Sequence, residues 1–291
     1  MQVQSTTARV LDIREIQFLF FDFLSLKDLR VYALASKASY DAVKDFFRRY
    51  YGIDTILGRF FPKDSIPRFR EAQRITGTLI GGSVALQFFA RLNFYHSDLD
   101  LYVHGLFADK LVAALTNMDC VALKQEEKDD NEIRKLLRLQ QQYATPCILQ
   151  ILDFVTPVGR KVQVVITGTR PVHAILQYHS TTVMNFISGD YAYALYGQET
   201  LQDGLALYSR SASLRTIQLA KAKYEHRGWR TVGSEAEAQA LQVFVPSSRA
   251  VGDEDTWIMR LGHANPGDAT VRDATWDLVY NLAGDGHIFP L

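Results

Sequence analysis

The stretch from Leu79 to Val103, LIGGSVALQFFARLNFYHSDLDLYV, constrains the fold more than any other part of this sequence. Gly81 and Gly82 permit a tight turn after a short strand, because glycine tolerates backbone angles that other residues avoid. Ser83 then begins a helix, whose free N–H groups favour a bound phosphate. The alternating DLDLYVH segment predicts a half-buried strand. We therefore expect a strand, a turn, a helix and a second strand.

Asp98 and Asp100 are two residues apart on the second of these strands. Side chains at this spacing point to one face, and Leu99, Leu101 and Val103 make the opposite face apolar. Two carboxylates on one face repel each other unless a positive charge lies between them. Magnesium, held by carboxylate and phosphate oxygens, commonly supplies that charge. The candidate site residues are the catalytic residues and metal ligands Asp98 and Asp100, and the nucleotide-binding residues Gly81, Gly82 and Ser83.

Composition predicts a globular protein with a sizeable core, since 47% of the 291 residues are hydrophobic and 12% are aromatic. Lys plus Arg and Asp plus Glu both number 32, so the net charge does not indicate a nucleic-acid partner. The two cysteines make no disulfide framework, and we expect a reducing compartment, cytoplasmic or nuclear. No apolar run reaches the roughly 18 residues that span a bilayer, so no membrane partner is expected.

Hydrophobic periodicity gives the order of the elements. Helices are expected through most of the first 75 residues, and Ser25 is expected to cap one of them with Asp28 in its first turn. Strands and helices then alternate. The remaining segments are expected to form two strands joined by a turn at 147–169, helices at 171–188 and 213–229, and short strands at 240–246, 255–261 and 274–282.

The Gly82-Ser83 turn, a helix and Asp98-Leu99-Asp100-Leu101 resemble the signature of the DNA polymerase β-type nucleotidyltransferase fold. The resemblance covers about residues 76–167. In that family the Gly-Ser turn holds the triphosphate, the Asp-x-Asp pair binds the metal ions, and a third carboxylate stands on a later strand. The resemblance implies an α+β fold with a mixed sheet and flanking helices, a nucleoside triphosphate partner and a Mg²⁺ cofactor.

The sequence departs from that pattern at the third carboxylate, where Gln163 stands between Val162 and Val164. An amide can offer a carbonyl oxygen to a metal, but it cannot act as a base on an attacking hydroxyl. Asp153, on the preceding strand, is either a substitute acid or an ordinary carboxylate near a strand end. Whether the chain is an enzyme therefore depends on what replaces the third acid.

The N-terminal segment carries Leu11, Glu15-Ile16, Phe23-Leu24-Ser25, Asp28-Leu29 and Ala35-Ser36-Lys37. This pattern resembles an F-box, a three-helix motif that docks on a Skp-type adaptor of a cullin ubiquitin ligase. The usual Leu-Pro start is missing, because Asp12 follows Leu11, and the glutamate lies one residue late. The resemblance implies a docking face near Leu11, Ile16 and Leu29. A helical cap packed on the following domain is the other interpretation.

Two stretches, 179–201 and 221–229, are similar to parts of uncharacterised basidiomycete fungal proteins that carry the same Gly-Ser and Asp-x-Asp block. In the first, three polar residues are expected on one helical face, lining a pocket. Around the second, a basic cluster either contacts a phosphate or faces solvent, and two aromatic residues either stack on a base or pack. These sets are Thr181, Thr182 and Asn185; Lys221, Lys223, Arg227 and Arg230; and Tyr224 and Trp229.

The sequence thus predicts an intracellular α+β protein of three parts. These are a helical F-box-like module at 1–70, a nucleotidyltransferase-like domain at 71–230, and a C-terminal extension of short strands and loops at 231–291. The leading functional hypothesis is a pseudoenzyme, degenerate at Gln163, that binds a nucleotide or a partner. The alternatives are an active Mg²⁺-dependent nucleotidyltransferase and an F-box substrate adaptor.

Overall fold

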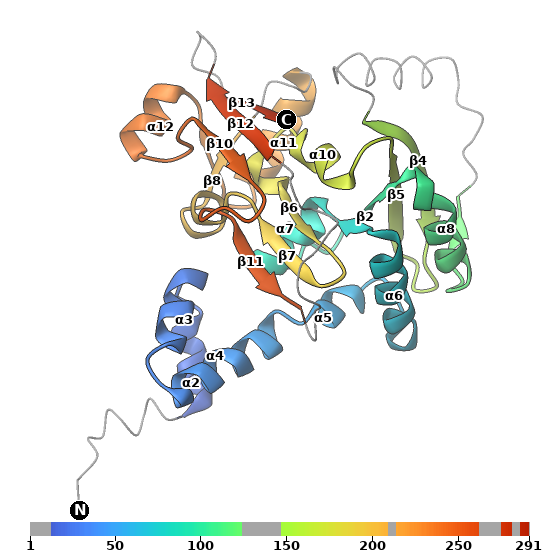
Figure 1. The fold of residues 1–291 in the computed structure, drawn as a ribbon, viewed down its shortest axis with the longest axis horizontal. Helices are drawn as coiled ribbons and strands as arrows, with labels where there is room; N and C mark the ends of the chain where they lie inside the picture. Colours follow the sequence, from blue (N-terminus) through green and yellow to red (C-terminus); the bar gives the residue numbers. More distant parts are fainter. Residues whose placement is uncertain (1–12, 124–146, 209–213, 262–274, 281–285, 291) are drawn as a thin grey trace, which may run out of the picture. The chain divides into compact units, whose positions relative to one another are not determined.

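The chain forms two compact units, Met1–Gly52 and Ile53–Leu291 (Figure 1). The predicted domain boundaries at residues 70 and 230 stay predictions, because compactness alone does not test independent folding. None of the helices described is long and apolar enough to cross a membrane. The computed structural model describes residues 13–123, 147–208, 214–261, 275–280 and 286–290.

The described part of the first unit, from residue 13 on, contains three helices, α2 (Arg14–Phe21), α3 (Leu26–Ala33) and α4 (Lys37–Tyr50). The predicted cap of α3 is confirmed: Ser25 Oγ accepts the Asp28 N–H at 3.0 Å, and Asp28 Oδ2 accepts the Ser25 N–H at 3.3 Å. This reciprocal capping box satisfies N–H groups that the first turn of a helix leaves without partners. It fixes the point at which α3 begins.

Aromatic side chains fill the interior of this first unit. The ring of Phe46 lies 5.4 Å from that of Phe21 and 5.6 Å from that of Phe18, measured between centroids. Leu29 is also buried, so its predicted position near a docking face is wrong: the side chain is part of the core. Ile16 is partly exposed, and Leu11 lies outside the described residues.

The second unit is built on a mixed eight-stranded sheet with the order β11-β7-β6-β1-β2-β5-β4-β3. Strands β2 and β5 run parallel, and the other neighbours are antiparallel. The predicted mixed sheet is therefore confirmed. Its strands are β1 (Leu79–Ile80), β2 (Leu99–His104), β3 (Val121–Ala122), β4 (Ile148–Val155), β5 (Lys161–Thr167), β6 (Asn185–Ile187), β7 (Tyr191–Ala194) and β11 (Trp257–Arg260).

The remaining strands that the structure describes in this unit form two smaller sheets. One is the parallel pair β8 (Leu205–Leu207) and β9 (Arg230–Val232). The other is antiparallel and contains β10 (Ser247–Ala250), β12 (Thr275–Tyr280) and β13 (Gly286–Pro290). The strands expected within 255–261 and 274–282 are thus confirmed as β11 and β12.

Helices α7, α8 and α10 pack against β2, which places this strand in the interior of the fold. The helices among the described residues of this unit are α5 (Ile53–Leu57), α6 (Ile66–Thr76), α7 (Gly82–Ala90), α8 (Ala108–Thr116), α10 (Pro171–Leu176), α11 (Leu214–Glu225) and α12 (Glu235–Leu241). Its shorter helical turns are η1 (Lys63–Ser65), η2 (Gly105–Phe107), η3 (Thr181–Val183) and the π-helical turn η4 (Gly197–Gln202).

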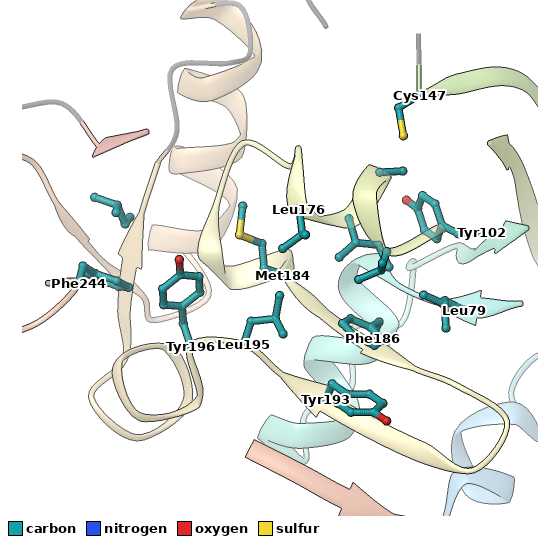
Figure 2. Packing of buried hydrophobic residues seen from close by; sticks show 14 of the residues in the cluster. Leu79, Tyr102, Cys147, Leu176, Met184, Phe186, Tyr193, Leu195, Tyr196 and Phe244 are labelled. Atoms are coloured by element: carbon teal, nitrogen blue, oxygen red, sulfur yellow. The ribbon is translucent and has the colours of Figure 1, made fainter. Parts of the chain in front are cut away.

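A continuous apolar core lies beside β6 and β7 (Figure 2). The rings of Phe186 and Tyr193 stack with their centroids 4.8 Å apart, and those of Tyr196 and Phe244 lie 5.7 Å apart. Met184 is fully buried in the same cluster. The cluster joins residues from 79 to 244, so this core ties the C-terminal part of the chain to the sheet.

Two predicted elements are wrong. The helix expected over 171–188 ends at Leu176, and the chain continues as η3 and then as β6, between β1 and β7. The strand expected over 240–246 is the end of α12 and an irregular segment, in which Phe244 takes a left-handed conformation (φ 48°) and is buried. In both segments tertiary packing outweighs the local apolar pattern, which cannot separate a short buried strand from a helix.

Candidate functional site

The Gly-Gly-Ser turn connects β1 to α7 at the centre of the large sheet. Strand β1 pairs with β2, and the Gly81 N–H donates to the Asp100 carbonyl at 3.0 Å. Gly82 has a positive φ of 61°. A Cβ atom added to Gly82 would collide with Asp100 Oδ2. Glycine is required here both by the backbone angle and by the carboxylate directly against it.

Asp98 and Asp100 share one face of β2, as the sequence predicts, and the buried Tyr102 follows them on that face. Leu99, Leu101 and Val103 are fully buried on the other face. The Asp98 side chain, just before β2, is 46% exposed, and Asp100 is partly buried. The structure therefore brings the second glycine of the turn and the second aspartate of the pair into contact at the start of α7.

The Asp100 carboxyl group titrates near neutrality. Burial raises its pKa to about 7, with further contributions from the charges of Asp98 and Asp153, while Lys223 and Lys161 lower it. Among the ion pairs of the described residues, none involves Asp100. A cation bound nearby would stabilise the ionised form of a carboxyl group whose pKa burial has raised.

Gln163 occupies the middle of a row of three residues on neighbouring strands. It pairs with Asp100 of β2 on one side and with Asp153 of β4 on the other. Gln163 Nε2 donates to Asp153 Oδ1 at 3.1 Å. Asp153 thus shares the face of the acid pair but lies two strands from Asp100, about 10 Å away at the usual strand spacing.

The charge of Asp153 is also compensated by a lysine. Lys161 Nζ lies 3.2 Å from Asp153 Oδ2 and 3.8 Å from Asp98 Oδ2. No three His, Cys, Asp or Glu side chains within the described part of the chain lie close enough to share a metal ion. Asp153 therefore does not complete a three-acid metal site in this arrangement.

Helix α11 brings Lys223 close to the acid pair. Burial and the charge of Arg227 lower the pKa of Lys223, and the charges of Asp100 and Asp98 raise it. The Arg227 guanidinium stacks on the Phe94 ring at 3.8 Å, and its buried Nη1 has no hydrogen-bond partner. These two cations are thus near the site, although they come from a segment more than 120 residues further along the chain.

The other two residues of the predicted basic cluster, Lys221 and Arg230, form ion pairs with glutamates. Lys221 forms an ion pair with Glu225 at 3.8 Å, and Arg230 forms an ion pair with Glu237. Of the four basic residues, Lys223 and Arg227 remain as candidates for phosphate contact. The sequence could not make this division, because all four lie within ten residues.

Tyr178 and His179 lie in the surroundings of the acid pair and its lysine, a position that the sequence did not predict. The charge of Asp100 contributes to a raised pKa of Tyr178, for which burial is the larger cause. Burial, with a contribution from Lys223, lowers the pKa of His179 to about 4, so its imidazole is neutral at pH 7. His179 Nε2 is buried without a hydrogen-bond partner. The only sequence signal was a Tyr-His pair in a segment predicted to be helical.

Tyr224 and Trp229, which were predicted either to stack on a base or to pack, pack inside the protein. Tyr224 and Trp229 are buried and pack with Leu86, and the Trp229 Nε1–H donates to the Thr200 carbonyl at 2.7 Å. They are therefore core residues, the second of the two predicted roles. Their rings are not open to a base.

The predicted pocket-lining face at Thr181, Thr182 and Asn185 is wrong. All three residues are buried, and they lie in η3 and β6. Thr181 Oγ1 accepts the Leu207 N–H at 3.1 Å, and Asn185 Nδ2 donates to the Thr182 carbonyl at 2.9 Å. Their polar groups serve to pair the buried backbone where the chain turns from η3 into β6.

The residues present fit a magnesium ion that arrives with a nucleotide. Mg²⁺ is commonly held by one or two carboxylates, with substrate phosphates and water completing its coordination. Asp98 and Asp100 supply hard oxygen ligands beside the N-terminus of α7, whose N–H groups favour phosphate. A divalent cation bound between the two acids would oppose the burial that raises the pKa of Asp100 and would keep its carboxylate ionised.

The chain matches no protein family model and no curated protein. It is similar to two solved structures, a Thermotoga maritima CCA-adding enzyme complexed with tRNA and a CCA-adding enzyme complexed with CTP. Their sequences are 11% and 13% identical to this one, and the TM-score is 0.40 in both comparisons. The aligned parts cover 66% and 64% of this chain and 45% of each enzyme. A likeness at this TM-score establishes neither a shared fold nor a shared activity.

Proposed function

We propose that the unit Ile53–Leu291 binds a nucleoside triphosphate together with Mg²⁺, and that nucleotidyl transfer is weak or lost. The observation that carries the proposal is the contact between Gly82, at the start of α7, and the Asp100 carboxylate. It combines a helix N-terminus that favours phosphate with an acid that favours a cation, as binding of a metal-nucleotide requires. Asp98 is the second proposed metal ligand.

Lys223 and Arg227 are the proposed cationic contacts for the phosphates on the side of α11. Lys223 is close enough to Asp98 and Asp100 for their charges to affect its pKa. Arg227 has a buried Nη1 without a hydrogen-bond partner, which a phosphate or a carbonyl oxygen of a ligand would satisfy. Together with α7 these residues would surround the triphosphate from two elements distant in sequence.

The proposed loss of transfer activity rests on Gln163 and Asp153. Gln163 cannot accept a proton from an attacking hydroxyl. Asp153 Oδ1 accepts a hydrogen bond from Gln163, and Asp153 Oδ2 lies beside the Lys161 ammonium. Both carboxylate oxygens of Asp153 are therefore already engaged by side chains of β5, which leaves neither directed at an attacking hydroxyl. Nucleotide binding without efficient chemistry is the function these residues support best.

Calorimetric titration tests the binding. Each of the four Mg²⁺-bound non-hydrolysable nucleoside triphosphates is titrated into wild type, Asp98→Asn/Asp100→Asn and Asp64→Asn, whose carboxylate is exposed outside the site. We expect wild type and Asp64→Asn to bind one nucleotide alike, and the double variant to bind at least about tenfold more weakly, about 1.4 kcal/mol. Absence of binding to folded wild type by all four nucleotides would contradict the proposal.

The same nucleotides in hydrolysable form separate binding from active transfer. Wild type incubated with labelled nucleotide, Mg²⁺ and a mixture of nucleic-acid and protein acceptors is expected to transfer no label above the level of the double variant. Label transferred by wild type and lost in the double variant would establish the active nucleotidyltransferase instead.

A second candidate function, docking on a Skp-type adaptor, is favoured by the surface of the first unit. Four apolar side chains of the α2–α3 segment are more than 60% exposed: Phe23 by 84%, Leu34 by 82%, Leu19 by 64% and Val31 by 63%. Exposed apolar residues in such a small helical unit are typical of a docking surface. F-box motifs dock largely by apolar contact, so these residues are the proposed docking residues.

A pull-down tests this second function. We expect a Skp-type adaptor to retain wild type and to retain Phe23→Ala/Leu34→Ala at least about tenfold less, since central apolar anchors dominate such interfaces. Leu106→Ala in the second unit removes an equally exposed leucine and serves as the matched control. Equal retention of all three proteins, or of none, would rule out docking through this surface.

A further inference from the structure

Lys161 stands among the acids of the site at the first position of β5. Its ammonium nitrogen lies 3.2 Å from Asp153 Oδ2 and 3.8 Å from Asp98 Oδ2. The two carboxylates come from β4 and from the residue before β2, the strands on either side of β5. A single ammonium group thus connects acids that are 55 residues apart in the sequence.

The register of the sheet explains why these side chains meet. Lys161 and Gln163 are two residues apart, so they share a face of β5. Gln163 lies opposite Asp100 on one side and opposite Asp153 on the other. Asp98 is two residues before Asp100 and shares its face. The ammonium of Lys161 therefore lies on the face that carries all three acids.

Asp153 holds Lys161 in place from the outer side. Gln163 Nε2 donates to Asp153 Oδ1 at 3.1 Å, and Lys161 approaches Oδ2, so both carboxylate oxygens face donors of β5. The side chains of Lys161 and Asp153 are each about two-thirds buried. Lysine carries a compact point charge, which can stand where a metal ion would stand between two carboxylates.

We propose that the Lys161 ammonium takes the place of a second divalent cation between Asp98 and Asp153, so that this site holds one ion with its nucleotide. The inference rests on the proposed nucleotide-binding function for the identity of the first ion. Its physical basis is the cost of placing a second cation within a few ångströms of a fixed positive charge. Removing the lysine charge leaves the Asp98 and Asp153 carboxylates on either side of a position without a cation, which favours a divalent ion there.

Titration of Mn²⁺ tests the role of Lys161, with bound ion measured from the loss of the electron paramagnetic resonance signal of free Mn²⁺. The full chain is used as wild type, Lys161→Met, Lys161→Gln and Lys161→Arg, each without nucleotide and with a non-hydrolysable triphosphate. We expect both neutral variants to bind one more Mn²⁺ than wild type, or to bind Mn²⁺ at least about tenfold more tightly. Lys161→Arg, which retains the charge, is expected to bind as wild type does.

Two further variants sharpen the result. Adding Asp153→Asn to Lys161→Met is expected to abolish the gain, because the new ion would lose one of its two flanking carboxylates. Lys110→Met removes an exposed lysine on α8 and is expected to change nothing. Thermal melting of each variant confirms that the protein is folded at the assay temperature.

The outcomes separate this inference from the proposed function. Two Mn²⁺ ions on wild type, or neutral variants that bind no more Mn²⁺ and no more tightly than wild type, overturn the role of Lys161. Nucleotide binding by wild type in that case leaves the proposed function intact. A gain of Mn²⁺ in the neutral variants, without nucleotide binding by wild type, supports the role of Lys161 and contradicts nucleotide binding.

Discussion

The Asp100 carboxyl group lies against the Gly82 backbone, and its surroundings set its chemistry. Burial, followed by the charge of Asp98, raises its pKa to about 7. In an unfolded chain the pKa returns to about 4. As the pH rises from about 4 to 7, the unfolded state loses a proton that the folded state keeps, so the contribution of this group to stability falls. Above pH 7 the folded protein carries the full cost of the ionised carboxylate.

Replacing Asp100 with asparagine removes this dependence while preserving the shape of the side chain. In protein without bound metal or nucleotide, we expect Asp100→Asn to raise the Tm relative to wild type at pH 8 and to raise it less, or to lower it, at pH 5. Calorimetric melting at the two pH values measures both differences. Asp64→Asn, at an exposed carboxylate, serves as the control. A Tm difference for Asp100→Asn that is the same at pH 5 and pH 8 would show that Asp100 is not held in its protonated form.

Single residues show where sequence reasoning stops. Gly82 was predicted to make a tight turn, and its φ of 61° confirms this. The second reason for glycine, the Asp100 carboxylate directly against its Cα, involves a residue 18 positions away. Lys161 gave no signal at all, because its importance lies in two contacts that only the pairing of β5 with its neighbours creates.

At the scale of elements, the local patterns with a clear period were read correctly. Strand β2 forms where the alternation predicts it, although Tyr102 is buried as well as Leu101 and Val103. The β4–β5 hairpin turns at Gly159 with its φ of 75°, and α11 lies within the predicted helix. The errors fall in 171–188, where the apolar run of β6 is buried between two other strands, and in 240–246, where Phe244 is buried in an irregular segment. A short element that is apolar on all sides has no period to read, so its neighbours decide its conformation.

At the scale of the whole molecule, the unfolding of the two compact units can be followed by different spectroscopic signals. The three tryptophans, Trp229, Trp257 and Trp276, all belong to the second unit, so tryptophan fluorescence reports on that unit alone. Circular dichroism at 222 nm reports on the helices of both units. The first unit depends on Phe46, whose ring contacts Phe18 and Phe21 in a small aromatic core.

Phe46→Ala is expected to destabilise the first unit by about 3–5 kcal/mol, the usual cost of removing a buried aromatic ring. The circular dichroism transition should then lose amplitude or begin at a lower temperature, while the fluorescence transition keeps its midpoint. Phe23→Ala, at an exposed ring, is the matched control and should leave both transitions unchanged. A fall in the fluorescence midpoint of Phe46→Ala would mean that the two units unfold together.

The sequence by itself determined the features that depend on neighbouring residues. These are the turn at Gly82, the shared face of Asp98 and Asp100, and the cap at Ser25, because backbone geometry and two-residue periodicity act over a few positions. Tertiary structure alone decided which distant charges meet. It brought Lys223 and Lys161 close to the acid pair, and it placed the side chain of Leu29 in the core of the first unit. The order and register of the strands and the packing of the helices depend on the whole chain.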